Sequence, residues 1–251
     1  FGWSALRIQN GACGAQILFR RLPLGLSVAY IPKGPLGPVE DWPGLWPELD
    51  RLCRERRGVF LLVEPDASEP PDPRLAQRMG SFGAPADTIQ PRRTLLIDLR
   101  GSESDWLARM SKTTRHCFKV ADQNDVKAVY SQDIEAFIRL MQQTGQRASF
   151  SVHSPAYYRR AFELFSPSQS CALILAQREG RNLAGVLIFR HGTRAHYLYG
   201  ASSGEDRQLN PTYLIQLESM RWAATRGCDY YDLWGVPDAD LETLESQFTG
   251  R

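Results

Sequence analysis

The sequence predicts a mixed α/β protein of the α+β class, built from two similar halves. The main observation is that the order strand, strand, strand, helix, strand occurs twice along the chain. The longest apolar runs, "GVFLLV" and "CALILA", have the length of buried strands. A hydrophobic fraction of 43% and a charged fraction of 23% are ordinary for a globular protein, and 251 residues suffice for one large core or two of ordinary size.

The first half predicts three strands, at 5–8, 15–23 and 26–32, followed by a helix within 41–58 and a strand at 59–65. The next stretch, to residue 74, is rich in proline and aspartate. It predicts a loop that leads into a short helix.

The second half predicts three strands, at 171–180, 182–192 and 194–202, joined by turns that contain glycine. A helix at 211–227 and a strand at 230–236 follow. Pro211 suits the first turn of that helix and Gly227 its end, so this helix is well specified.

The segment between the halves begins with a strand at 94–99 and a helix whose expected N-cap is Ser104. A second helix is expected at 134–145, where apolar residues recur at i, i+3, i+4 and i+7. The domain boundary is expected near residue 130, which gives domains 1–130 and 131–251.

Composition narrows the classes of function. No apolar run approaches the ~18 residues of a membrane span, and no signal peptide opens the chain. The five cysteines are scattered without a CxxC pair, so neither a disulfide framework nor a metal site is expected, and a cytoplasmic protein fits best. The net charge is only +2, but several runs are basic and the stretch "DADLETLESQ" is acidic. Local basic surface suits an anionic partner; solvated helix faces are the alternative.

Several blocks of sequence resemble the FemABX-type aminoacyltransferases, which build peptidoglycan cross-bridges. The matching blocks are "FGW" at 1–3, "YIPKGPLG" at 30–37, "TLLIDL" at 94–99, "MSKTTRHCFKVADQNDV" at 110–126, "TGQRASFSVHSPAYY" at 144–158, "AHYLYGAS" at 195–202 and "LNPTYLIQLESMRWAATRGCDYYDLWGVP" at 209–237. The resemblance implies two tandem GNAT-like acyltransferase domains, each a mostly antiparallel sheet flanked by helices. Members of the family carry further segments at both ends, so we expect this sequence to be part of a longer chain.

The resemblance also implies an activity: transfer of an amino acid from aminoacyl-tRNA to the side-chain amine of the third residue in a muropeptide stem. The implied partners are a UDP- or lipid-linked muropeptide and the charged tRNA, with peripheral contact at the inner membrane face. No cofactor and a monomer are expected. Two alternatives stay open: a GNAT N-acyltransferase that uses acyl-CoA, and a non-catalytic muropeptide-binding module.

The acceptor site is expected to hold a diphosphate. Lys33 stands between two prolines, and its ammonium is suited to phosphate oxygens, with Gly34 and Pro35 fixing the turn. Arg147 offers a bidentate guanidinium. By resemblance these two residues contact the diphosphate; an ordinary loop lysine and a salt-bridged arginine are the alternatives. The other residues implied at the substrate are His153, Tyr157, Tyr158 and Tyr197.

The acyl-donor site is expected at the end of the strand "AHYLYGAS". Strand alternation places Tyr197 and Tyr199 on one face, and Tyr199 is expected to line the site. Asp232 and Asp98 are catalytic candidates, although a buried acid is more often a satisfied structural partner. The sequence contains no Ser-His-Asp or Cys-His arrangement that predicts a covalent intermediate.

Two further patterns concern the donor. Four basic residues, Arg109, Lys112, Arg115 and Lys119, recur every three or four positions, so one helix face could contact tRNA phosphates. A solvated surface face is the alternative. The stretch "RQLNPTYL" lacks the glycines of a pyrophosphate-binding turn, and Pro211 removes an N–H donor, which argues against CoA.

Overall fold

The computed structural model describes residues 2–67, 72–91, 93–149 and 151–236. The chain divides into two compact units, Phe1–Gln90 and Pro91–Arg251. The division falls earlier than the expected boundary near 130, because β5 (Arg93–Asp98) and β6 (Lys127–Ser131) both belong to the sheet of the second unit. The acidic run "DADLETLESQ" lies outside the described residues.

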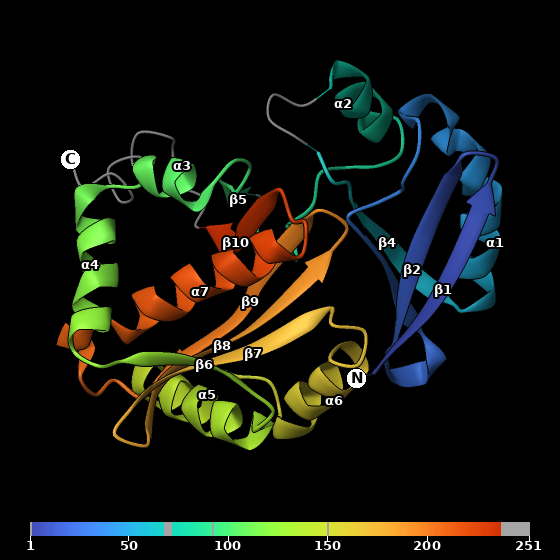
Figure 1. Ribbon diagram of the computed structural model, residues 1–251. Helices are drawn as coiled ribbons and strands as arrows, with labels where there is room; N and C mark the ends of the chain where they lie inside the picture. Colours follow the sequence, from blue (N-terminus) through green and yellow to red (C-terminus); the bar gives the residue numbers. More distant parts are fainter. Residues whose placement is uncertain (1, 68–71, 92, 150, 237–251) are drawn as a thin grey trace. The chain divides into compact units, whose positions relative to one another are not determined.

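The first unit contains one four-stranded sheet and its helices (Figure 1). Its elements are β1 (Trp3–Asn10), β2 (Cys13–Arg21), β3 (Ser27–Pro32), the 3-10 turns η1 (Pro23–Gly25) and η2 (Val39–Leu45), α1 (Trp46–Glu55), β4 (Gly58–Glu64) and α2 (Pro73–Gly80). The strands follow each other in chain order; the first two pairs are antiparallel, and β3 pairs with β4 in parallel. The predicted order of elements is therefore confirmed.

The core of the first unit lies between its sheet and the segment that contains η2 and α1. Ile17 and Ile31 from the sheet and Leu45 and Leu49 from this segment are fully buried. The expected helix at 41–58 begins as a 3-10 turn because Pro43 has no N–H to donate to a helical carbonyl.

The second unit contains a six-stranded sheet of order β5-β10-β9-β8-β7-β6. Its remaining elements are α3 (Glu103–Ala108), α4 (Lys112–Gln123), α5 (Ile134–Ala148), α6 (Pro155–Phe165), β7 (Cys171–Arg178), β8 (Arg181–His191), β9 (Arg194–Ser202), η3 (Arg207–Leu209), α7 (Pro211–Thr225) and β10 (Tyr230–Val236). Every neighbouring pair is antiparallel except β9 with β10, which is parallel.

Helices cover the two faces of this sheet, with α5 and α6 on one side and α4 and α7 on the other (Figure 1). The central strand β8 is therefore buried on both faces, and its residues from Leu183 to Ile188 are apolar or glycine. Gly185 permits the close approach of α5, because a Cβ there would stand 2.9 Å from Leu175 and 3.1 Å from Phe137.

Helix ends in the second unit differ from the prediction at three places. The N-cap of α3 is Ser102 and not Ser104, because Ser102 forms a capping box with Asp105. The basic segment that follows is interrupted, since Ser111 caps a separate helix, α4. Helix α5 continues to Ala148, so Arg147 lies in its last turn.

In the part of the chain that the structure describes, no helix has the length and apolarity needed to cross a bilayer. All five cysteines fall in this part, and each is a free thiol.

Candidate functional site

The candidate site lies where β9 and β10 diverge within the sheet of the second unit. The two strands pair only from Tyr230 with Arg194 to Asp232 with His196, after which β10 continues along β5. β8 stays paired along the whole of β9. Within the described residues, the β10-facing edge of β9 therefore has no strand partner beyond His196. β9 and β10 are thus splayed apart beyond this point.

A β-bulge at Leu198 sets the direction of the side chains on β9. Tyr197 pairs with Ile188, and Tyr199 pairs with the neighbouring Leu187, so one extra residue is inserted on β9. Tyr197 therefore packs in the core on the α7 side, and Tyr199 packs on the α5 and α6 side. The prediction that Tyr197 and Tyr199 share a face is wrong, because the bulge resets the alternation between them.

Asp232 is the buried acid at the point of divergence, with only 2% of its surface exposed. Its Oδ1 accepts hydrogen bonds from the Thr94 hydroxyl and from the Trp234 N–H, the latter at 2.8 Å. On its other side, His196 Nδ1 lies 3.5 Å and Arg194 Nη1 lies 3.8 Å from Oδ2. One carboxylate thus joins β5, β9 and β10.

The surroundings of Asp232 stabilise its ionised form. Burial alone would raise its pKa, but the neighbouring His196 imidazole, the Thr94 hydroxyl and the Trp234 N–H together hold the pKa below its ordinary value. His196 also meets the Trp234 ring edge-on, with ring centroids 5.8 Å apart. Its Nδ1 is buried and makes no hydrogen bond within the described residues, so the ring is held in place by packing.

A cluster of aromatic rings surrounds Tyr199 on the same side of the sheet as α5 and α6. The hydroxyls of Tyr157 and Tyr199 are hydrogen-bonded at 2.5 Å. His153 stacks on Tyr157 with ring centroids 4.1 Å apart and meets Tyr199 edge-on. Tyr158 is fully buried and packs against Phe137, so it is the member of the Tyr157–Tyr158 pair that forms core. Burial is the main cause that raises the pKa of Tyr199, which keeps its hydroxyl protonated.

Arg147 closes the far end of β9. Its guanidinium donates to the Ser202 carbonyl at 2.8 Å and to the Ser202 hydroxyl at 3.0 Å. The Thr144 hydroxyl binds the same residue, accepting from the Ser202 N–H at 2.9 Å. The predicted substrate residues Arg147, His153, Tyr157 and Tyr199 therefore all meet at β9, while Tyr197 faces the opposite core.

Lys33 lies in the first unit, in the turn after β3. Its Nζ forms an exposed ion pair with Asp66 Oδ1 at 3.1 Å. The Gly34 N–H donates to the Glu64 carbonyl at 3.2 Å, and the bond between Gly34 and Pro35 is cis. The turn is thus anchored on the end of β4 and presents the lysine at the surface.

Known proteins resemble this chain in sequence and in structure. A family model described as "Acetyltransferase (GNAT) domain" matches residues 108–241, just over half of the chain. The chain belongs to this GNAT acyltransferase family.

Other relatives resemble this chain over both units. The lipid II:glycine glycyltransferase of Staphylococcus aureus is 22% identical over 330 residues, an alignment that covers 96% of this chain and 78% of the relative. The solved structure titled "Crystal structure of FemX" has a TM-score of 0.86 at 20% identity and covers 96% of this chain and 82% of that one. A tandem GNAT protein of the clavulanic acid pathway has a TM-score of 0.60 at 15% identity, covering 99% and 79% of the two chains. The expected FemX-like relationship and the two-sheet GNAT-like fold are confirmed, and the chain is a transferase.

Asp98 occupies the end of β5 and binds neighbouring backbone and side chains. Its carboxylate pairs with Arg100 at 2.6 Å, and this hydrogen bond is the main cause that lowers its pKa. Its carbonyl accepts from Arg109 at 2.6 Å. The residue of β5 that reaches Asp232 is Thr94. Asp98 is thus a half-exposed residue at the end of β5.

The four basic residues of the central segment do not form one helix face. Arg109 follows α3 and binds the Asp98 carbonyl, and Arg115 donates to the carbonyls at the end of α3, including that of Met110. Lys112 and Lys119 are exposed on α4. The helix break before Ser111 is the physical reason, because it gives the two segments different axes.

The start of α7 lies within the stretch "RQLNPTYL", which lacks the glycines of a pyrophosphate-binding turn. Pro211 is its first residue and has no N–H, and the N–H of Tyr213 is already bonded to the Asn210 carbonyl at 3.0 Å. Few backbone donors therefore point away from this end.

Two residues of the site were not predicted from the sequence: His196 and Thr94. His196 and Asp232 each occupy the third position of their strands, and a parallel β9–β10 register would have brought them together. Thr94 needs the β5–β10 register, which has a bulge between Asp232 and Gly235.

Proposed function

We propose that this GNAT protein transfers an amino acid from aminoacyl-tRNA to the side-chain amine of the third residue of a peptidoglycan stem peptide. The observation that supports this most is the likeness to a protein named lipid II:glycine glycyltransferase, at 22% identity over 96% of this chain and 78% of the relative. The reaction is cytoplasmic, needs no cofactor and is carried out by a monomer, with peripheral membrane contact where the acceptor is lipid-linked.

The splayed edge of β9 supplies the acyl-donor site. The ester carbonyl of the donor lies along the unpaired edge beyond His196, where free backbone groups can bind the developing oxyanion. The acceptor amine attacks this carbonyl. The new amide C–N bond forms, the ester C–O bond breaks, and the ribose oxygen leaves with a proton.

His196 is the proposed acceptor of the proton that the amine loses. Its Nδ1 faces the Asp232 carboxylate, which leaves Nε2 to take the proton, and the ion-pair distance of 3.5 Å shortens as the imidazolium forms. Asp232 is held charged by Thr94 and Trp234, so it stabilises the imidazolium without being protonated itself.

The acceptor is bound through its diphosphate. Lys33 is the proposed diphosphate contact in the first unit, with Gly34 and Pro35 shaping the turn. In the second unit, considered by itself, Arg147 at the end of β9 is a proposed anion contact. Both side chains hold exchangeable partners, Asp66 for Lys33 and Ser202 for Arg147. The aromatic group of His153, Tyr157 and Tyr199 lies beside Ser202 on β9 and is proposed to contact the stem peptide.

The tRNA is proposed to contact the exposed cations of α4, Lys112 and Lys119. Arg109 and Arg115 would act mainly by fixing the break between α3 and α4, since their guanidinium groups bind carbonyls there. The Pro211 start of α7 supports a donor other than CoA.

A transfer assay tests the proposal. The protein is incubated with a panel of tRNAs charged with radiolabelled amino acids and with either UDP- or lipid-linked muropeptide. Label in the muropeptide from at least one tRNA is the expected result. Binding of muropeptide without transfer from any tRNA would identify a binding module and overturn the proposal.

A further inference from the structure

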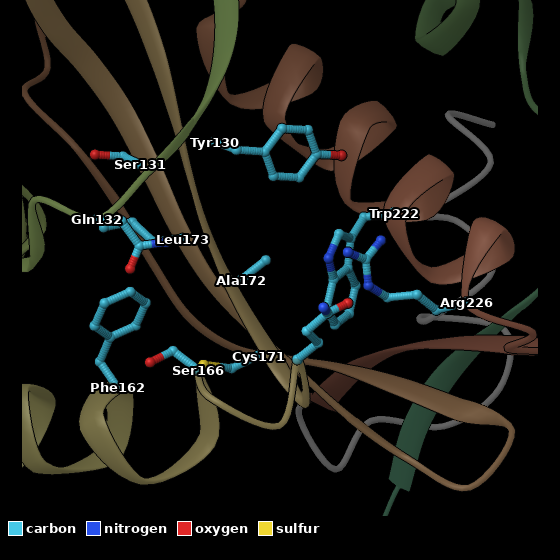
Figure 2. A pocket seen from close by; sticks show the side chains of 11 residues that line it. Tyr130, Ser131, Gln132, Phe162, Ser166, Cys171, Ala172, Leu173, Trp222 and Arg226 are labelled. Carbon is cyan, nitrogen blue, oxygen red and sulfur yellow. The ribbon is translucent and has the colours of Figure 1, made fainter.

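A cavity lies in the second unit beside β6, the edge strand of the sheet on the side opposite β5. Its volume is about 240 Å³, and it is bounded by the ends of β6, α6 and α7 and by the start of β7. The strands β8 and β7 separate this edge from β9, so the cavity is distinct from the divergence of β9 and β10. Figure 2 shows Tyr130, Gln132, Phe162 and Arg226 around one space, although they come from different elements.

Arg226 is the charged residue of this cavity. Its guanidinium lies over the Trp222 ring, 4.8 Å from the ring centre, and its Nε is buried without a hydrogen-bond partner. Within the described residues its side chain makes no hydrogen bond or ion pair. Figure 2 shows the guanidinium extending from α7 along Trp222. Stacking on a ring holds the plane of a guanidinium and leaves its edge free for a bidentate anion.

The nearest acid on α7 is already committed elsewhere. Glu218 accepts from the Tyr130 hydroxyl at 2.8 Å and pairs with Arg221 at 3.4 Å. Arg221 is in turn paired with Glu103 at 2.8 Å. Glu218 and Glu103 thus share Arg221, and within the described residues no acid forms an ion pair with Arg226.

The lining also contains neutral polar side chains, among them Gln132, Ser166 and Gln169. These three make no side-chain hydrogen bond within the described part of the chain; Ser166 is half-buried and both glutamines are exposed, so all three are accessible to a ligand. Gln169 is held in place through its backbone, since its carbonyl accepts from Arg190 at 3.3 Å. Several unpaired polar groups around one cavity are typical of a small-molecule site.

We propose that this cavity binds a small organic carboxylate that also carries a hydroxyl or amide group. The carboxylate pairs with Arg226, and the neutral group bonds to Gln132, Ser166 or Gln169. A single lining cation matches one negative charge better than the double charge of a phosphate. The volume corresponds to roughly eight water molecules at ~30 Å³ each, which limits the ligand to a molecule of similar size.

The test uses lactate as the probe and lactamide, its uncharged counterpart of the same shape, as the control ligand. Both are titrated into the ¹⁵N-labelled protein while the Arg226 Nε–H signal and the side-chain amide signals of Gln132 and Gln169 are followed. Lactate is expected to shift these signals to saturation and lactamide is not. Unmoved signals with lactate, or equal saturation by lactamide, would overturn the proposal, and tighter binding of inorganic phosphate than of lactate would overturn the carboxylate assignment.

Amino-acid substitutions test whether lactate binds in this cavity. Arg226→Gln is expected to weaken lactate binding about tenfold or more, because a charge-assisted bond is lost. The control Arg139→Gln removes an exposed arginine of α5 that pairs with Asp133, and binding should stay within about twofold. An equal loss in both variants would mean that lactate binds at no particular site. If Arg226→Gln fails to fold by circular dichroism, the combined variant Gln132→Leu, Ser166→Ala and Gln169→Leu decides: weaker binding supports the site, and unchanged binding contradicts it.

Discussion

Replacement of Asp232 by asparagine tests the arrangement at the divergence of β9 and β10. The carboxylate accepts from Thr94 and Trp234 while it is buried. A hydrogen bond to a charged group contributes about 1.5–3 kcal/mol and a neutral one about 0.5–1.5 kcal/mol, so two weakened bonds cost about 2–3 kcal/mol together. The half-exposed Arg194 at 3.8 Å adds little to this sum.

The loss of stability in Asp232→Asn is expected to depend on pH. The pKa of Asp232 is lowered in the folded protein, so its contribution is complete above the ordinary aspartate pKa of about 3.9 and is lost as the pH falls through the folded value. The free energies of unfolding of the wild type and Asp232→Asn should therefore differ at pH 7 and converge toward pH 3.

Urea unfolding followed by tryptophan fluorescence at a series of pH values measures both effects. Asp98→Asn is the matched control, because Asp98 is a half-exposed acid on the neighbouring strand β5 and is far more accessible than Asp232. It should change the free energy of unfolding less than Asp232→Asn does. Equal stability of Asp232→Asn and the wild type at pH 7 would refute the view that this carboxylate joins the three strands.

Three further substitutions test other parts of the molecule. Tyr199→Phe removes the hydroxyl bonded to Tyr157; it should cost at most about 1.5 kcal/mol in urea unfolding and slow the proposed transfer, and full transfer activity would exclude a role for this hydroxyl. Gly200→Ala places a Cβ against the Tyr197 ring, and we expect a loss of about 1–3 kcal/mol from overpacking; an unchanged urea midpoint would contradict that contact. Lys33→Ala should raise the acceptor KM about tenfold or more with an unchanged urea midpoint, and a wild-type KM would remove Lys33 from the proposed diphosphate site.

The order of elements could be predicted because local patterns encode it. Apolar runs mark β7 and β8, glycine-containing turns separate β7, β8 and β9, and Pro211 marks the start of α7. The division between the units could not be predicted, because it depends on β5 and β6 pairing with strands far along the chain.

Part of the candidate site was predicted from the sequence. The contacts that were not predicted depend on the register in which the strands pair. Tyr199 and Asp232, both named as candidates from the sequence, lie on the two strands that diverge, β9 and β10. The sequence alone could not show that a bulge at Leu198 turns Tyr197 to the other face. The approach of His196 to Asp232 follows from a parallel pairing of only three residue pairs. Such a short pairing leaves no periodic signal in the sequence.

The central claim is that the edge of β9 accepts an aminoacyl group from tRNA. The most direct measurement offers the protein a radiolabelled aminoacyl-tRNA and labelled acetyl-CoA together, with a muropeptide acceptor, and identifies the labelled product by mass spectrometry. We predict a muropeptide extended by one amino acid, with no acetylated product. An acetylated acceptor without an aminoacylated one would contradict the account.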